Sequence, residues 1–309
     1  MALAFGLFGL PAVPGHGAAA PLRVAVTIPP LTWLVAEVGG AGIVVSHLVD
    51  VGESPETFQP TDRQISRVGR SAIFFRIGVP AENGRWLRAL EASGRTRVVD
   101  LREGIALREM DEGHDHSHGG GHAHHDHHDH HDHHGASDGA LAGMDPHIWL
   151  SPRRLEVMTW TIADALAAVD PSQADAYARR AASVAGAMRA LDDDLRKILA
   201  PVRGRAFLVL HPAWGYFADD YELRQLSIEI GGKMPADAEL TALIRQVREH
   251  EIRTLFVQPQ IHSDSSATVA RALGARLEML DPLAVDLPSN LRRTAEHLVE
   301  AMRAPDDVH

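Results

Sequence analysis

Four residues that can bind a metal ion stand beside predicted strands or helices. His211 follows the apolar run AFLVL, and Asp281 follows RLEML. Glu56 lies in the turn DVGESPETFQPT after the run IVVSHLV, and His147 lies in MDPHIWLSP just before a helical pattern. Ligands of parallel α/β sheets bind beyond the carboxyl ends of the strands. Two imidazoles and two carboxylates there predict a four-coordinate site for a divalent first-row metal ion.

Each of these residues also has an ordinary structural explanation. A histidine after a strand is often only hydrogen-bonded within the fold, and a glutamate in a Gly/Ser/Pro turn is usually solvated. Asp281 precedes a proline, where aspartate commonly forms a turn or caps a helix. The metal-site interpretation therefore depends on the joint placement of the four, and on the proline near each of them, which restricts the backbone.

A second group of candidate ligands lies in one low-complexity stretch, GHDHSHGGGHAHHDHHDHHDHHG, at residues 113–135. It holds twelve of the 20 histidines and no large apolar residue. Such a segment cannot bury enough apolar surface to fold, so we expect a surface loop over about 111–142. Its candidate ligands are His114, His116, His118, His122, His124, His125, His127, His128, His130, His131, His133 and His134.

Irregularly spaced imidazoles on such a histidine tract give many weak, exchangeable metal sites. We expect the tract to capture or sense zinc and to raise its concentration near the principal site. Because imidazole protonates near pH 6.5, metal binding by the tract should fade below roughly pH 6. The alternative is a solubilising insert that binds metal without a functional role.

The overall composition limits the classes of function. The chain has 309 residues, with 41 acidic against 30 basic side chains, a formal net charge of −11, and no cysteine. A nucleic-acid-binding protein would need a basic surface, so that class is not expected. Without thiolates, any metal ion must be held by imidazole and carboxylate groups.

Predicted strands alternate with helical patterns in two series. This rhythm predicts an α/β fold with two lobes, each a small, mostly parallel sheet flanked by helices. Between the series, a helical pattern of about 29 residues follows Asp170 and Pro171. It predicts one long rigid helix of roughly 40 Å that joins the lobes. The strands are expected at 22–27, 43–49, 72–77, 96–101, 206–210, 225–230, 254–258 and 276–280.

The N-terminal run MALAFGLFGLPAVPGHGAAA has the apolar centre and small-residue end of a secretory signal, although it lacks the basic residues that usually come first. We therefore expect a signal peptide and a periplasmic protein. The predicted parts of the chain are a signal peptide at 1–20, an N-terminal α/β lobe at 21–169, a linking helix at 170–200 and a C-terminal α/β lobe at 201–309.

Four stretches of the sequence together resemble one family. They are GESPETFQPTDRQISRVGRSAIFFRIGVPAENGRWL, MDPHIWLSP, FLVLHPAWGYFADDYEL and LDPLA, and the similarity extends from about residue 22 to 303. In this order they are similar to the zinc- and manganese-binding proteins of bacterial ABC importers, the ZnuA-like solute-binding proteins. The resemblance implies two α/β lobes joined by a long helix, one metal ion in the cleft between them, and no enzymatic activity. It also implies an ABC permease as partner, with a periplasmic metallochaperone as a further candidate, and we expect a monomer.

The resemblance also assigns ligands. His147, His211 and Asp281 match three of the family's metal ligands. At the remaining position the family has histidine after a proline, whereas this chain reads Pro55-Glu56-Thr57-Phe58. Glu56 then either binds the metal in place of histidine or leaves that position to water. Nearby His47 lies inside a strand pattern and is a weaker candidate.

The glutamate bears on which cation is bound. Carboxylate suits manganese better than imidazole does, but Zn²⁺ accepts both ligands and Mn²⁺ binds more weakly at most sites. The histidine tract, typical of zinc-specific members of the family, makes Zn²⁺ the expected cation and Mn²⁺ the alternative. Two other functions are a zinc buffer or metallochaperone acting through the tract alone, and a mononuclear zinc hydrolase with Glu56 as base. The hydrolase is not expected, because the sequence has neither HExxH nor a nucleophile elbow.

Overall fold

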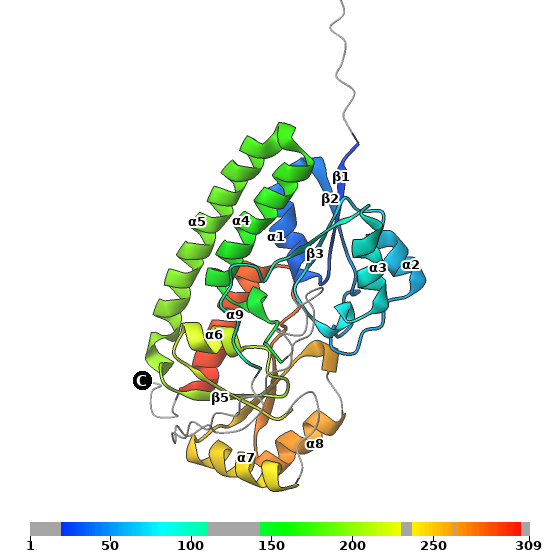
Figure 1. The fold of residues 1–309 in the computed structure, drawn as a ribbon. Coiled ribbons are helices and arrows are strands. Elements are labelled where there is room, and N and C mark those ends of the chain that lie inside the picture. The colour runs from blue at the N-terminus through cyan, green and yellow to red at the C-terminus, as the bar shows by residue number, and fades with distance from the viewer. Residues whose placement is uncertain (1–19, 111–142, 230–236, 262–263, 304–309) are drawn as a thin grey trace, which may run out of the picture.

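Two parallel four-stranded sheets form the framework of the protein in a computed structural model that describes residues 20–110, 143–229, 237–261 and 264–303 (Figure 1). The strand orders are β2-β1-β3-β4 and β6-β5-β7-β8. These sheets and their flanking helices confirm the predicted fold class. The strands are β1 (Leu22–Val26), β2 (Ile43–His47), β3 (Ile73–Arg76), β4 (Arg97–Asp100), β5 (Ala206–Val209), β6 (Arg224–Ser227), β7 (Thr254–Val257) and β8 (Arg276–Met279).

Both sheets have the same topology, with the first strand in chain order lying between the second and the third. The chain therefore leaves β1 and β5 to one side, and later crosses to the other side of the same strand. At such a switch point the loops diverge and open a crevice at the carboxyl edge of the sheet. The loops that follow β2 and β5 lie at this edge, so the topology brings Glu56 and His211 to the region where ligands bind.

Helices cover both faces of each sheet, because alternate residues of the strands are buried on opposite sides. In β1, Val24 and Val26 belong to the large central core, whereas Ala25 belongs to a smaller core on the opposite face. The helices are α1 (Pro30–Gly39), α2 (Asp62–Val68), α3 (Arg85–Ser93), α4 (Pro152–Val169), α5 (Ala174–Leu199), α6 (Gly215–Asp220), α7 (Asp237–Glu249), α8 (Asp264–Leu273) and α9 (Leu287–Met302).

The longest helix, α5, runs beside both halves of the molecule (Figure 1). Its 26 residues span about 40 Å, and it packs on α1 and α4 of the N-terminal half and on α9 of the C-terminal half. One apolar core includes Val24 of β1, Met188 of α5 and Phe207 of β5. The two sheets therefore share a core through α5, which resists wide separation of the halves.

The long helix begins later than the sequence pattern predicts. Asp170 ends α4, and Pro171–Gln173 form a 3-10 turn before α5 starts at Ala174. Asp170 therefore stabilises the turn between the two helices, because its carboxylate accepts a hydrogen bond from the Ser172 hydroxyl at 2.6 Å. The change of direction at this turn lets α4 and α5 pack side by side.

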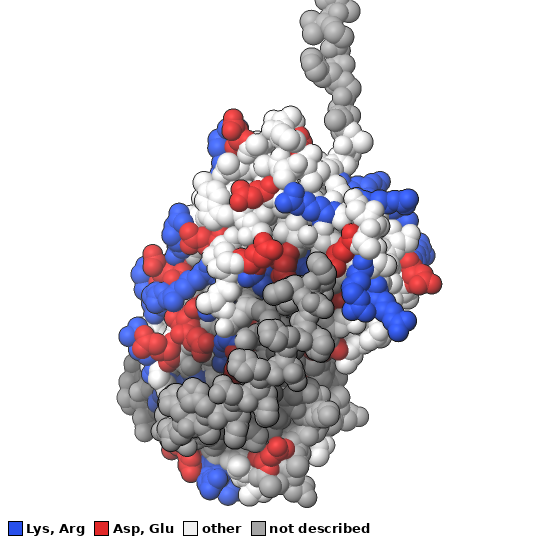
Figure 2. Space-filling model, viewed as in Figure 1, with Lys and Arg blue, Asp and Glu red and all other residues white. Residues whose placement is uncertain are grey.

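The outer surface of α4 and α5 carries charges of both signs, which Figure 2 shows side by side along this edge of the molecule. Asp192 lies 3.3 Å from Arg153 and 2.7 Å from Arg196. Asp192 is mostly buried, with a side chain 14% exposed, whereas the two arginines are 44% and 39% exposed, so solvent screens these pairs only in part. Within the described residues, no helix has an apolar stretch long enough to span a bilayer.

Candidate metal centre

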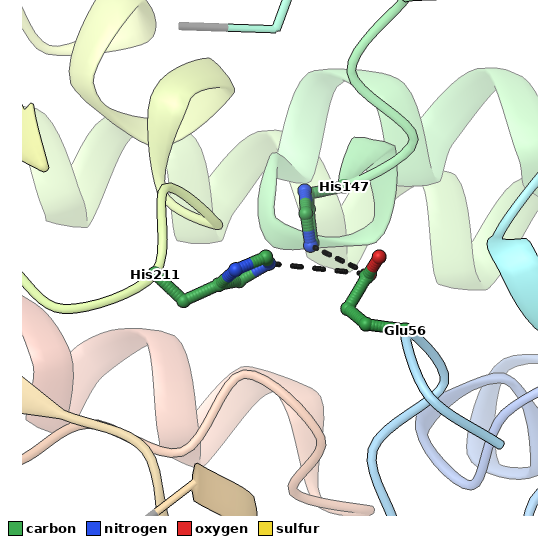
Figure 3. A group of neighbouring side chains, drawn as sticks. All are labelled: Glu56, His147 and His211. Carbon is green, nitrogen blue, oxygen red and sulfur yellow. Dashed lines mark ion pairs between the residues drawn. The ribbon is translucent and has the colours of Figure 1, made fainter. Parts of the chain in front are cut away.

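Three of the four predicted ligands converge between the two halves. Glu56, His147 and His211 point toward one another from three separate segments, and their potential ligand atoms lie within 4.8 Å of one another (Figure 3). The Nε2 atoms of His147 and His211 each lie 3.9 Å from Glu56 Oε1. Among the described residues this is the only group of three or more histidine, aspartate or glutamate side chains that could hold a metal ion.

The atoms at the centre of this group are buried and lack hydrogen-bond partners. Glu56 Oε1 and His211 Nε2 have no partner within the described structure, although the side chains of Glu56 and His211 are only 22% and 6% exposed. An unsatisfied buried polar group costs about 1–3 kcal/mol. Zn²⁺ ligands bound at about 2 Å in a tetrahedral site lie roughly 3.3 Å apart. The observed 3.9 Å separations would need to close only slightly around a cation.

Glu56 is held by a loop that is fixed at both ends. Thr61 caps α2 through a reciprocal capping box with Gln64, and the Gln64 amide donates to Asp50 at 2.9 Å, across the base of the loop. Within the loop, the backbone N–H of Glu56 donates to Ser54 Oγ at 3.3 Å. Local hydrogen bonds of Ser, Thr and Asp thus shape the turn that directs Glu56 into the cleft.

His147 lies on the turn that leads into α4, and Asp145 orients its ring. Asp145 Oδ1 lies 2.7 Å from His147 Nδ1 and also accepts the backbone N–H of His147 at 2.9 Å. Because a carboxylate only accepts, Nδ1 carries the proton and Nε2 is left to bind a cation. Burial alone would lower the pKa of His147, but the adjacent Asp145 carboxylate raises it above the ordinary value of 6.5. Protons therefore compete with a cation for this nitrogen.

His211 follows β5 and has a similar partner in the C-terminal half. Its Nδ1 lies 2.9 Å from Oε2 of Glu229, a residue two positions beyond the end of β6. The two imidazole rings are 5.3 Å apart between centroids and inclined at 70°. In both histidines Nδ1 thus contacts a carboxylate and Nε2 faces Glu56. This is the usual arrangement of metal-binding histidines.

Asp281 does not belong to the group of three. Its Oδ1 accepts hydrogen bonds from the Gln260 amide and from the backbone N–H of Leu283, both at 2.9 Å. The adjoining segment nevertheless lies near the centre, because the Trp149 indole donates to the Pro282 carbonyl at 2.7 Å. Asp281 as fourth ligand stays a prediction.

The remaining candidates lie elsewhere. His47 ends β2, where burial and the nearby Arg67 guanidinium lower its pKa, and it does not join the group of three. The twelve histidines of the tract fall within 111–142, outside the described residues, as does the predicted signal peptide apart from its last residue.

Two supporting carboxylates, Asp145 and Glu229, escaped the sequence analysis. Asp145 stands two positions before His147 in the MDPHIWLSP motif, and Glu229 lies within the predicted strand 225–230. The rule that found His211 could have found Glu229, because both stand near the carboxyl end of a strand. Their partners are fixed only by the tertiary structure.

Comparison with known proteins identifies one family. Residues 24–304 match the family described as zinc-uptake complex component A, periplasmic. A crystal structure of ZnuA is 32% identical, covers 92% of this chain and all of the ZnuA chain, and superposes with a TM-score of 0.77. A zinc-bound deletion mutant of ZnuA, also 32% identical, covers 92% of this chain and 99% of the other, with a TM-score of 0.78.

Curated relatives are more distant. The zinc-binding protein AdcA of Streptococcus pyogenes is 27% identical over 269 residues, which cover 85% of this chain but only 50% of AdcA. The chain thus spans about half the length of this relative. A putative metal-binding protein of Treponema pallidum is 29% identical over 265 residues, covering 84% of this chain and 78% of the relative.

Proposed function

Since the chain belongs to the zinc-uptake complex component A family, we propose that it binds Zn²⁺ outside the cytoplasm and delivers it to an ABC permease for import. The family consists of metal-binding components of ABC importers and not of enzymes, in agreement with the sequence analysis. In this proposal Glu56, His147 and His211 hold the cation, which is the cargo of the protein.

The observation that carries the proposal is the pair of unsatisfied atoms at the centre. Glu56 Oε1 and His211 Nε2 are buried, face each other at 3.9 Å, and lack hydrogen-bond partners within the described structure. Asp145 and Glu229 already occupy the Nδ1 atoms of both rings. A divalent cation can bind Glu56 Oε1 and both Nε2 atoms at the same time. A single hydrogen bond would satisfy only two of these three atoms.

The donor set favours Zn²⁺ over Mn²⁺. Two imidazole nitrogens and one carboxylate oxygen are common ligands of Zn²⁺, whereas Mn²⁺ prefers sites richer in oxygen and binds more weakly at mixed sites. We propose Asp281 as the fourth ligand, reached when its carboxylate turns away from Gln260. The hydrogen bond between Trp149 and the Pro282 carbonyl supports this assignment, because it holds the segment beside the centre.

We also propose that the histidine tract feeds the centre. The backbone N–H of Met110 donates to the Gly143 carbonyl at 2.9 Å, and that of Asp145 donates to the Arg108 carbonyl at 2.9 Å. The described residues on either side of 111–142 thus lie beside Asp145, which contacts His147. Zinc captured by the tract would be released close to the cleft, which would raise its local concentration there.

The remaining parts of the proposal concern the whole protein. We propose export by the N-terminal signal, a monomer with lobes at 21–169 and 201–309 joined by the helix at 170–200, and a permease partner, with a periplasmic metallochaperone as a second one. Because the halves share one core, release would proceed through small shifts of the halves and movement of ligand loops. Glu56 is the most exposed of the three ligands, so its loop is the natural place for release to begin.

The test uses metal-free protein that lacks residues 113–135. Zn²⁺ and Mn²⁺ are titrated against a chelating competitor, with wild-type Glu56 and with Glu56→Ala. We expect one tight zinc per chain, weaker manganese binding, and a strong loss of zinc affinity on substitution of Glu56.

One outcome would contradict the proposal. Absence of a tight site in the protein without the tract would transfer the function to the tract. Full-length protein with His147→Ala and His211→Ala separates the two functions, because a buffer acting through the tract alone would keep its zinc capacity.

A further inference from the structure

One arginine links the ligand-bearing segments of both halves. We propose that Arg108 is a positioning residue for the metal centre: its guanidinium ties the orientation of His147 to the position of the C-terminal half, and thereby slows release of the cation. This inference rests on the proposed function and concerns a residue that does not touch the metal.

The guanidinium bridges two carboxylates from different halves. Arg108 Nη1 lies 3.2 Å from Asp145 Oδ2, and Arg108 Nε lies 3.0 Å from Asp219 Oδ2 on α6. Asp145 binds His147 through its other oxygen, Oδ1. A continuous chain of polar contacts therefore runs from Asp219, through Arg108 and Asp145, to the imidazole of His147.

Backbone contacts reinforce this bridge. The Tyr216 hydroxyl on α6 donates to the Asp145 carbonyl at 2.8 Å and accepts the Arg108 N–H at 3.2 Å. Gly215 contacts Arg108 and Asp145 closely. A Cβ at this position would overlap the Arg108 guanidinium and lie 2.9 Å from Asp145 Oδ2. The start of α6 thus has a glycine where the arginine and aspartate of the other half approach it.

The burial of the three charged groups explains why the arginine matters. The Asp145 side chain is fully buried, that of Arg108 is 22% exposed, and that of Asp219 is 52% exposed. The Asp145 carboxylate is thus shielded from solvent, and the Arg108 guanidinium supplies it with a permanent positive charge and a hydrogen-bond donor. The contact with Arg108 thus holds the Asp145 carboxylate in the position from which its other oxygen contacts the ring of His147.

The exposed end of the bridge provides the coupling between the halves. Any shift of α6 away from the N-terminal half must break or stretch the contact between Arg108 and Asp219. While that contact holds, Asp145 and His147 keep the orientation that binds the cation. Loss of the contact removes an ion pair between the guanidinium and the C-terminal half, so the cation should leave sooner.

The test compares zinc affinity and zinc release in full-length protein carrying Arg108→Met, Arg108→Lys, Asp219→Asn, or both Arg108→Met and Asp219→Asn. We expect Arg108→Met to weaken zinc binding by roughly 10–100-fold, as is usual for groups behind a metal ligand. Asp219→Asn should have a smaller effect, seen mainly as faster dissociation. The double variant should bind no more weakly than Arg108→Met alone, because both substitutions break one chain of contacts. Arg108→Lys should restore part of the loss through its charge beside Asp145.

The matched control is Arg205→Met, which replaces an exposed arginine whose side chain makes no hydrogen bond or ion pair within the described part of the chain. Tight zinc binding by the wild type together with unchanged binding by Arg108→Met would overturn this inference and leave the proposed function standing. Additive effects of the Arg108 and Asp219 substitutions would overturn the coupling. If Arg108→Met does not fold, an unchanged dissociation rate in Asp219→Asn overturns it equally. Failure of the wild type to bind zinc would overturn both proposals.

Discussion

Each of the two histidines of the candidate metal centre has a carboxylate partner, but the two carboxylates differ in burial and in the number of their own contacts. In the N-terminal half, the Asp145 side chain is fully buried and engages the Nδ1 of His147, the backbone N–H of the same residue and the Arg108 guanidinium. In the C-terminal half, the Glu229 side chain is 14% exposed and pairs with His211 alone among the described residues. Within the described residues, one imidazole is thus fixed on a buried network, and the other has one hydrogen-bonded partner.

This difference suggests how a site can bind tightly and still release its cargo. A ligand that is oriented in advance loses little entropy on binding and supports affinity. A ligand with one support can adjust to the cation or turn away from it at small cost. We therefore expect affinity to depend mostly on the N-terminal support, and release to begin at His211 or at the more exposed Glu56.

Removal of the charge behind His147 should have the largest effect. In Asp145→Asn one carboxylate oxygen is replaced by an NH2 group, which must face either the Arg108 guanidinium or the N–H groups of His147. All of these groups are donors, so one contact becomes repulsive. We expect zinc affinity to fall by about 100-fold, at the upper end for such supporting groups. Chelator competition measures the effect, with exposed Glu300→Gln as the control of equal chemistry. Near-wild-type affinity would show that the N-terminal support is dispensable.

The equivalent change in the C-terminal half should cost less. Glu229→Gln keeps an oxygen that can accept from His211 Nδ1, and no arginine pairing is lost among the described residues. We expect zinc affinity to fall by about 10-fold or less, the lower end for groups behind a metal ligand. The same competition assay run beside Asp145→Asn tests the comparison directly. Equal losses in the two variants would mean that the halves are equally firm.

The pH dependence of zinc binding should separate the halves further. The pKa of His147 is raised because the Asp145 carboxylate outweighs the effect of burial. As the pH falls through this raised pKa, above 6.5, the proton displaces the cation, so affinity should begin to fall at a higher pH than for a free imidazole. In Asp145→Asn, burial and the Arg108 guanidinium still lower the pKa of His147, and only the smaller effect of the Glu56 carboxylate raises it, so the fall should move to lower pH. Zinc affinity measured between pH 5 and 8, with the tract removed, would contradict this if the substitution left the profile unchanged.

The sequence predicts much of the fold and most of the centre, for physical reasons that also explain the gaps. Alternation of β-branched runs with helical patterns predicts each of the eight strands found in the described residues, because buried parallel strands must be apolar on both faces. Ligands of parallel sheets bind beyond the carboxyl ends of the strands, and this rule predicts Glu56 and His211, because the topology alone brings those loops together. The start of α5 differs by three residues, because a 3-10 turn at Pro171 is a local choice that the helical pattern does not specify.

The support of the centre is less predictable than the centre itself. Arg108 and Asp219 are 111 positions apart in the chain, and only the packing of α6 against the N-terminal half brings them to 3.0 Å. Asp281 shows another limit: its motif predicts a ligand, but it does not predict that the carboxylate also accepts hydrogen bonds from Gln260 and Leu283. Residue type and strand position indicate which side chains can reach a cleft, but contacts between side chains decide which of them are free to bind.

The smallest effect we predict tests whether the firmness of the N-terminal half extends beyond the metal centre. Burial raises the pKa of Asp100 at the end of β4, but hydrogen bonds from Arg102 outweigh it and lower the pKa below 3.8. A lowered carboxyl pKa stabilises the fold above the pKa of the unfolded chain, and that stabilisation disappears as the pH falls through the folded pKa. Asp100→Asn should therefore lower the free energy of unfolding by about 1 kcal/mol at pH 7 and by progressively less below pH 4.

Urea unfolding of metal-free protein at several pH values measures this difference, and zinc competition on the same variant completes the test. We expect zinc affinity to stay near that of the wild type, because Asp100 contacts Arg102 and Arg76 rather than the residues that hold His147. A loss of affinity as large as in Asp145→Asn would mean that the whole N-terminal sheet, and not the local network around Asp145, keeps the imidazole in place. The contrast between the two histidines would then be a contrast between two lobes, and stabilising substitutions anywhere in the N-terminal sheet should slow release of the cation.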